Sequence, residues 1–275
     1  MPKEIFGYEV LDYIGEGAGS LLYVVTDPVD RQLYALKHVV RRKEKDVRFI
    51  EQLQTEYEIS RRFKHPVLRR SILERDNGGF LRKPTEAILL MELFDGVTLE
   101  HFVRADCRRL VEVFIQVAQG LGALHAMGQI HCDLKPNNIL ISPDNAAKII
   151  DFGQCAKAGS IKERIQGTPD FISPEQVRCD PVTPRTDVFN LGATMYWTLT
   201  GRAIPTLFTL KREENSFLVD QRIMSPRDIN AGIPEPLSNL VTECIRTNPS
   251  KRPQDMSDLS RRLEVVQHGM NRQVA

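Results

Sequence analysis

The feature that most constrains this chain is a polar stretch at residues 131–153, which reads HCDLKPNNILISPDNAAKIIDFG. Two of its carboxylates and one of its amides stand at suggestive spacings, since Asn138 follows Asp133 by five positions (138 − 133) and Asp151 follows Asn138 by thirteen (151 − 138). A single Asp or Asn more often caps a turn, and Pro136-Asn137 is itself a turn signal. Carboxylate and amide oxygens are also the hard ligands that suit Mg²⁺. The stretch therefore predicts either ordinary turns or, if its members act together, one polar site.

Composition limits the kind of protein without deciding the fold. With 275 residues and 41% hydrophobic content, the chain allows one large bilobal domain or two small ones. The net charge of +1, from 37 basic and 36 acidic residues, gives no overall field toward nucleic acid or an anionic membrane. Apolar runs such as residues 87–91 are too short for a bilayer span, and the N-terminus lacks a signal-peptide pattern. Five cysteines without a CxxC pair argue against a zinc site or a disulfide framework. We therefore expect a cytoplasmic protein with reduced thiols.

The first third of the chain has the pattern of β-strands, and most of the rest has the pattern of helices. Short runs of β-branched and aliphatic residues predict strands at residues 8–14, 21–27, 32–40 and 88–91. Apolar residues at three- and four-residue spacing predict a helix over residues 46–63 and another that includes residues 110–124. A small β-rich part followed by a larger helical part is an α+β layout.

Glycines between the first two predicted strands mark a second candidate site, at Gly15-Glu16-Gly17-Ala18-Gly19-Ser20. Backbone amides in such a turn can approach phosphate oxygens, although any tight hairpin also uses glycine. The strand-like LLYVV that follows disfavours a dinucleotide-binding fold, which needs a helix there. Lys37 lies in an apolar strand and needs an anionic partner if it is buried. Glu56, nineteen positions on (56 − 37), is a candidate for that partner.

Taken together, these motifs resemble the eukaryotic-type, or Hanks-type, protein kinase family. HCDLKPNN and DFG resemble its H-R-D-x-K-x-x-N catalytic loop and its D-F-G motif, with Cys132 in place of the arginine. The resemblance implies a bilobal fold with a small antiparallel β-rich N-lobe and a larger, mainly helical C-lobe. We expect a kinase domain at 8–268, divided into an N-lobe (8–91), a hinge (92–96) and a C-lobe (97–268), with short tails at 1–7 and 269–275. The GTPDFISPEQ and DVFNLGATMYWTLTG segments are closer to bacterial members of the family than to animal ones.

The resemblance also implies roles for the polar residues. Asp133 would be the catalytic base for the substrate hydroxyl, and Lys135 would neutralise the transferred phosphoryl group and favour a Ser/Thr acceptor over Tyr. Lys37, oriented by Glu56, would hold the α- and β-phosphates of ATP. Asn138 and Asp151 would be the Mg²⁺ ligands. The remaining nucleotide contacts would come from Ile14, Gly15, Glu16, Gly17, Ala18, Gly19, Ser20, Leu22, Ala35, Met91, Glu92, Phe94 and Leu140.

Two segments look like scaffolding for this site. GTPDFISPE at residues 167–175 resembles the substrate-docking loop and the A-P-E motif, with Ser173 in place of Ala. Glu175 is expected to pair with Arg252 in a buried ion pair. Asp187 matches the family aspartate that holds the backbone of the catalytic loop.

The chain departs from the family where phosphorylation usually controls activity. The arginine that would receive an activation-loop phosphate is replaced by Cys132, and the usual phosphosite aligns with Arg164. Residues 161–167, IKERIQG, contain no hydroxyl side chain. We therefore predict that activity does not require phosphorylation of this segment.

Two other departures concern packing and redox chemistry. Ser60 occupies a position where the family usually has a bulky apolar residue against the DFG phenylalanine, here Phe152, so the helix at 46–63 is expected to be less firmly held. Cys155 is expected near Cys132, which raises the hypothesis of a redox switch. The competing interpretation is that both cysteines are inert small apolar residues.

The resemblance implies an ATP- and Mg²⁺-dependent Ser/Thr protein kinase acting on protein substrates, with no nucleic-acid partner and no membrane insertion. One alternative is a pseudokinase that binds nucleotide or a partner without phosphoryl transfer, supported by Cys132, Ser20 and Ser60. A small-molecule kinase is disfavoured by the GTPDFISPE segment.

Overall fold

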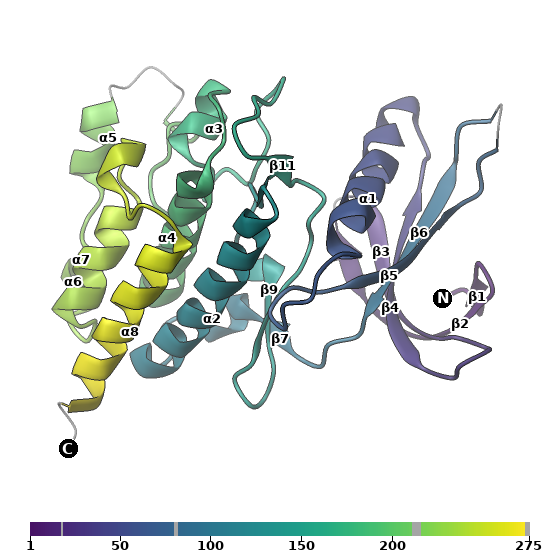
Figure 1. The fold of residues 1–275 in the computed structure, drawn as a ribbon, viewed down its shortest axis with the longest axis horizontal. Helices are drawn as coiled ribbons and strands as arrows, with labels where there is room; N and C mark the ends of the chain where they lie inside the picture. The colour runs from purple at the N-terminus through teal and green to yellow at the C-terminus, as the bar shows by residue number, and fades with distance from the viewer. Residues whose placement is uncertain (18, 80–81, 211–215, 273–275) are drawn as a thin grey trace. The chain divides into compact units, whose positions relative to one another are not determined.

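A computed structural model describes residues 1–17, 19–79, 82–210 and 216–272, with residues 216–218 described by their backbone alone. The chain forms two compact units (Figure 1). The first consists of Met1–Asp95 together with Asp151–Gly153, and the second of Gly96–Ile150 and Gln154–Ala275. The first unit is built on an antiparallel sheet and the second mainly on helices, so the α+β fold class is confirmed.

The first unit is a six-stranded antiparallel sheet in the order β1-β2-β3-β4-β6-β5. Its strands are β1 (Glu4–Ile5), β2 (Tyr8–Gly17), β3 (Ser20–Thr26), β4 (Leu33–Val40), β5 (Ser71–Asp76) and β6 (Glu86–Glu92). The predicted strands lie within or overlap β2, β3, β4 and β6, and the first three form the two expected hairpins.

Strand β6 is central to the core of this unit, because its side chains are buried in apolar clusters on both faces of the sheet. Ile88 and Leu90 belong to an apolar cluster on one face, whereas Leu89 and Met91 belong to a cluster on the other face. Side chains alternate between the faces of a strand, so a continuous apolar run is typical of a strand that is buried on both sides. Helix α1 (Val47–Ser60) supplies Ile50 and Leu53 to the second cluster.

The ends of α1 differ slightly from the prediction of residues 46–63. Asp46 is the N-cap residue, and its carboxylate accepts hydrogen bonds from the amides of Arg42 and Lys43 (3.1 and 2.8 Å). The helix ends at Ser60, three residues earlier than its apolar pattern predicts. Phe63 is buried beyond the helix end, so its apolar character reflects packing in a turn rather than another helical turn.

The glycine segment is also tighter than predicted. Strand β2 continues to Gly17 and β3 begins at Ser20, so the predicted turn over residues 15–19 is mostly extended strand. Gly19 has φ +82°, and a Cβ built there would lie 2.4 Å from the ring of Phe49. Glycine is therefore required at position 19 both by the backbone and by the close ring.

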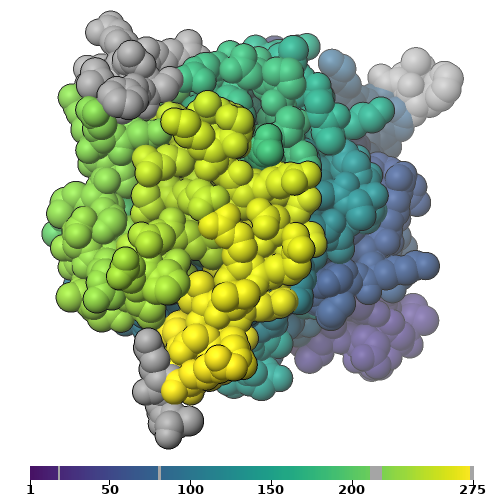
Figure 2. Space-filling view, turned by 60° about the vertical axis from the view of Figure 1, so that its left-hand side comes forward, coloured from purple at the N-terminus to yellow at the C-terminus, as the bar shows by residue number. Residues whose placement is uncertain are grey.

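The second unit is mainly helical. Helix α2 (Cys107–Ala126) contains the predicted apolar stripe of residues 110–124, and α4 (Pro184–Thr200) is buried along nearly its whole length. Figure 2 shows α8 (Met256–Arg272), in yellow, across one face of this unit beside the green helices. The other α-helices among the described residues of this unit are α3 (Pro174–Arg178), α5 (Ser216–Arg222), α6 (Pro226–Ile229) and α7 (Glu235–Cys244).

Short strands support the loops of this unit. Strand β9 (Ile139–Ile141) pairs with β7 (Val97–Thr98) and β10 (Ala147–Ile149), and β11 (Ala156–Lys157) pairs with β8 (Gln129–Ile130). Among the described residues, none of the helices combines the length and the apolar character needed to cross a bilayer.

Candidate active site

In the first unit, Lys37 lies between two carboxylates. Its Nζ atom is 2.7 Å from Glu56 Oε2 and 3.3 Å from Asp151 Oδ1. Burial lowers the pKa of Lys37, but the charges of Asp151 and Glu56 and the hydrogen bond to Glu56 outweigh that effect and raise it above its ordinary value. Lys37 is therefore a fixed cation, and the expected ion pair with Glu56 is present.

Phe152, the residue after Asp151, packs edge-on against Phe63 with ring centroids 4.6 Å apart. The ring therefore finds an aromatic partner just beyond the end of α1. Ser60 is fully buried, and its Oγ atom lies 2.5 Å from both the Glu56 carbonyl oxygen and Ser71 Oγ. The structure thus gives Ser60 a polar role in place of the apolar contact that the family resemblance implies.

The other residues expected to hold the nucleotide in the first unit come from β2, β3, β4, β6 and the residues next to these strands. Ala35 and Met91 belong to the apolar cluster on the face that α1 covers, and the partly buried Leu22 packs against that cluster. Glu92 ends β6, and its amide donates a hydrogen bond to the Arg70 carbonyl (3.0 Å). Strand β2 contains Ile14, Gly15, Glu16 and Gly17, and β3 begins at Ser20. Gly19 lies between these two strands, and Phe94 follows β6. Ala18 lies outside the described residues.

A cavity of about 270 Å³ lies beside the glycine segment, with Glu16, Gly17, Gly19 and Ser20 in its lining. His38 and Val40 also line it, and both point to the face of β4 opposite Lys37, because side chains alternate along a strand. The cavity is therefore not assigned to the phosphates that Lys37 would hold.

In the second unit, the Asp133 carboxylate contacts the hydroxyl group of Thr168 and the ammonium group of Lys135. Asp133 Oδ1 accepts a hydrogen bond from Thr168 Oγ1 at 2.8 Å, and Lys135 Nζ donates to the same hydroxyl at 2.9 Å. Lys135 Nζ also lies 3.5 Å from Asp133 Oδ2. The site therefore holds an aliphatic hydroxyl between a carboxylate and a cation.

Asn138 is oriented by the same loop. Its Nδ2 atom donates to the Asp133 carbonyl at 2.8 Å, which turns the amide nitrogen toward the loop and leaves the side-chain oxygen as the donor atom for a metal. Asp151 supplies a partly exposed carboxylate in the first unit. Both side chains offer hard oxygen atoms and fit a Mg²⁺ ion chemically. Leu140 is the half-buried middle residue of β9.

Asp187, on α4, holds the backbone that precedes Asp133. Its carboxylate accepts hydrogen bonds from the amides of His131 and Cys132 (2.8 and 2.9 Å) and lies 2.7 Å from His125 Nε2. Burial would raise the pKa of Asp187, but the hydrogen bond and charge of His125, followed by His131, outweigh it and lower the pKa. Cys132 adopts a left-handed backbone with φ +65°, which requires strong local support.

Gln176 is a residue of this site that the sequence did not reveal. Its Nε2 atom donates to the carbonyls of Cys132 (2.6 Å) and Gln166 (3.1 Å), so one side chain bridges the catalytic loop and the segment before Thr168. Its Oε1 atom accepts from Ser173 and from Asn190 Nδ2. The available signal was the S-x-x-Q pattern of a capping box at the start of α3, which predicts the helix end but not the bridge.

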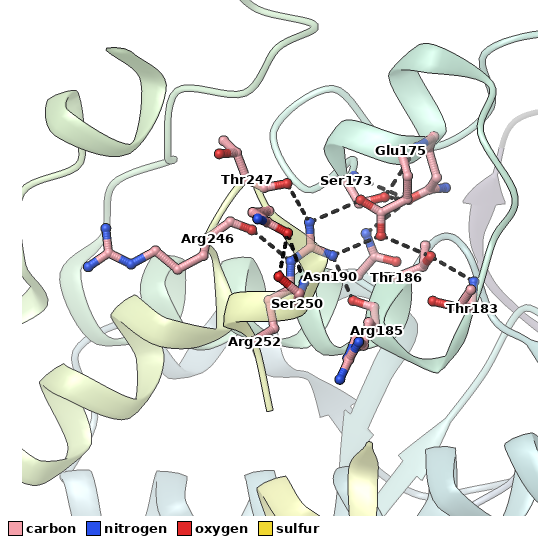
Figure 3. A network of polar contacts seen from close by, with 12 residues as sticks. Ser173, Glu175, Thr183, Arg185, Thr186, Asn190, Arg246, Thr247, Ser250 and Arg252 are labelled. Carbon is pink, nitrogen blue, oxygen red and sulfur yellow. Dashed lines mark hydrogen bonds and ion pairs between the residues drawn. The ribbon is translucent and has the colours of Figure 1, made fainter. Parts of the chain in front are cut away.

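The expected ion pair between Glu175 and Arg252 is present and almost fully buried (Figure 3). Two nitrogens of Arg252 contact the two carboxylate oxygens of Glu175 at 2.8 and 3.0 Å. The guanidinium also donates to the carbonyls of Arg185, Arg246 and Thr247. A guanidinium group that donates two parallel hydrogen bonds to one carboxylate forms the strongest kind of ion pair between these groups.

Cys132 does not have the environment of a reactive thiol. It is buried against Ile130 and Val182, and burial raises the pKa of its thiol. The thiolate is the reactive form, so this environment opposes oxidation. The structure favours the interpretation of Cys132 as a small apolar residue.

Comparison with known proteins identifies the family of the chain. The protein kinase domain family matches residues 8–268, and the chain belongs to that family. It is 28% identical over 281 residues to the serine/threonine-protein kinase PknB of Mycobacterium tuberculosis, covering 95% of this chain and 43% of PknB. It is 24% identical over 275 residues to a protein of Clostridium acetobutylicum named probable serine/threonine-protein kinase, covering 95% of this chain and 40% of that protein. The chain thus spans less than half the length of these bacterial Hanks-type relatives.

Proposed function

We propose that this chain is a protein kinase that transfers the γ-phosphoryl group of ATP to Ser or Thr hydroxyls of protein substrates. The observation that carries the proposal is the hydroxyl of Thr168, held between Asp133 and Lys135. An acceptor hydroxyl needs the same two groups, a carboxylate that takes its proton and a cation that stabilises the transferred phosphoryl group.

The first unit supplies groups for the nucleotide. Lys37, fixed by Glu56, offers a permanent positive charge for the α- and β-phosphates. The backbone of residues 15–17 and 19–20 would lie over the phosphates. Met91 would be the gatekeeper, and the Glu92 carbonyl and the Phe94 amide would hydrogen-bond the adenine. Asn138 and Asp151 would hold Mg²⁺, which when bound neutralises charge on the phosphate oxygens.

We further propose that the catalytic loop is held without an activation-loop phosphate. Two contacts support this proposal, because Gln176 donates to the Cys132 carbonyl and Asp187 accepts from the Cys132 amide. Both polar groups of the residue that replaces the usual arginine are therefore bound within the second unit. Segment 161–167 has no hydroxyl that a kinase could modify.

We also propose a cytoplasmic location. All five cysteines are free, which is typical of proteins in a reducing compartment.

The direct test is transfer of labelled phosphate from Mg-ATP to generic protein substrates. We expect wild type and the control Lys45→Ala, which changes an exposed lysine, to transfer label to Ser and Thr. Lys37→Ala and Asp151→Ala should lose nearly all transfer. Equal signal in all four proteins would defeat the assignment, and nucleotide binding without transfer by wild type would identify a pseudokinase.

A further inference from the structure

Glu56 has a second cationic partner that the proposed reaction does not use. Arg69 lies just before β5, and its Nη2 atom is 3.8 Å from Glu56 Oε1, whereas Lys37 contacts Oε2. The two carboxylate oxygens therefore face two different cations. Both Arg69 and Glu56 are buried, so their charges interact with little screening by solvent.

One turn further along α1, a second polar contact joins the same two elements. Ser60 Oγ lies 2.5 Å from Ser71 Oγ, in β5, and 2.5 Å from the carbonyl of Glu56. Residues 56 and 60 lie on one face of the helix, while residues 69 and 71 lie on one side of the chain that enters β5. We call the set Glu56, Ser60, Arg69 and Ser71 the polar seam, and none of its members is more than 8% exposed.

The polar seam has consequences for Lys37. A buried carboxylate held by Lys37 alone would lose its only compensation whenever Lys37 moved toward phosphate. Arg69 removes that dependence, because Glu56 keeps a cation on its other oxygen. The Ser60–Ser71 contact also ties the helix to β5, at a position where the family resemblance implies an apolar residue.

We propose that Arg69 is a positioning residue, which fixes Glu56 and, with the Ser60–Ser71 contact, holds α1 against β5 in the position where Glu56 reaches Lys37. The consequence for catalysis rests on the proposed kinase function. The proposal that the polar seam holds α1 against β5 does not rest on that function, because both elements belong to the first unit.

The kinetic test compares Arg69→Met, Arg69→Lys and the control Arg70→Met, which changes the neighbouring, exposed arginine. Arg69→Met should raise KM for ATP about tenfold or more, because Glu56 then has no second cation when Lys37 turns toward the phosphates. Arg69→Lys, which keeps the charge, should stay within about threefold of wild type. If Arg69→Met only reduced the fraction of correctly folded protein, the apparent kcat would fall and KM for ATP would stay unchanged. That result would overturn the proposal.

The structural test measures hydrogen exchange of the α1 amides, residues 47–60, in the full chain without nucleotide. Lys37→Met should leave most of their protection, because Arg69 still pairs with Glu56. Lys37→Met combined with Arg69→Met should lose far more protection than the two single changes predict by addition. Additive effects would contradict the proposal. If wild type transfers no phosphate, the proposed function fails, and this exchange experiment alone decides whether the polar seam holds the helix.

Discussion

At the scale of single residues, the site depends on a few short contacts around Asp133. Its carboxylate is bound to Thr168, its amide lies 3.3 Å from His131 Nδ1, and its carbonyl accepts from Asn138. Each contact restricts one part of the residue, so side chain and backbone are both fixed. Catalysis by positioning requires this kind of restriction.

Thr168 offers a direct test of that restriction. Thr168→Val keeps the shape but removes the hydroxyl, leaving Asp133 and Lys135 without their shared partner. We expect kcat to fall roughly 10- to 100-fold, the typical effect of a lost hydrogen bond to a charged group. Thr168→Ser, the matched control, should stay within about threefold in steady-state phosphoryl transfer. Equal kcat in the Val and Ser variants would show that the hydroxyl has no such role.

Asp187 predicts a dependence of stability on pH. The pKa of Asp187 is lowered in the folded protein, so its contribution is fully present above the ordinary value of about 3.9 and is lost as pH falls through the lower folded-state pKa. We expect Asp187→Asn to be less stable than wild type at pH 7, with the difference shrinking below pH of about 4. Urea unfolding of both proteins from pH 7 to pH 3 measures this, and a constant difference would count against the account.

Cys132 should tolerate a change that a redox switch would not. Cys132→Ala should retain activity within about twofold, because the thiol is buried and its raised pKa keeps it protonated. Activity assays with and without reductant, on wild type and variant, check this expectation. Loss of wild-type activity on oxidation, absent from the variant, would restore the switch hypothesis.

At the scale of elements, the Glu175–Arg252 pair joins the start of α3 to the segment before α8. Removing one partner of a buried pair leaves an uncompensated charge, so we expect Arg252→Met to lower the free energy of unfolding by about 3 to 5 kcal/mol. The control is Arg262→Met, whose pair with Glu243 is more than a third exposed and should contribute below about 1 kcal/mol. Chemical denaturation measures both, and equal losses would contradict this difference.

The elements also show where sequence patterns reach their limit. The strands β2, β3, β4 and β6 and the helices α1 and α2 were predictable, because their apolar spacing matches the face that they bury. The end of α1 was not, since Phe63 continues the apolar pattern while packing against Phe152 beyond the helix. The glycine segment was predicted as a turn, but its pairing extends β2 to Gly17.

At the scale of the whole molecule, the chemical groups were predictable and their supports were not. The sequence predicts Lys37, Glu56, Asp133 and Asp151 as the reacting and binding groups, because short motifs fix their spacing. Gln176 and Arg69 were missed, because each acts on a residue that is far away in the sequence, and only the fold brings the partners together. The fold also assigns Asp151–Gly153 to the first unit, although in the sequence these three residues lie between two segments of the second unit.

The central claim is that this chain transfers phosphate without an activation-loop phosphate. The most direct measurement is transfer of labelled phosphate to protein by phosphatase-treated wild type, with mass spectrometry to show that residues 161–175 carry no phosphate, beside Asp133→Asn. We predict full activity in the treated wild type and a loss of at least about 100-fold in Asp133→Asn. Activity that returns only after another kinase modifies residues 161–175, or equal transfer by the two proteins, would contradict the claim.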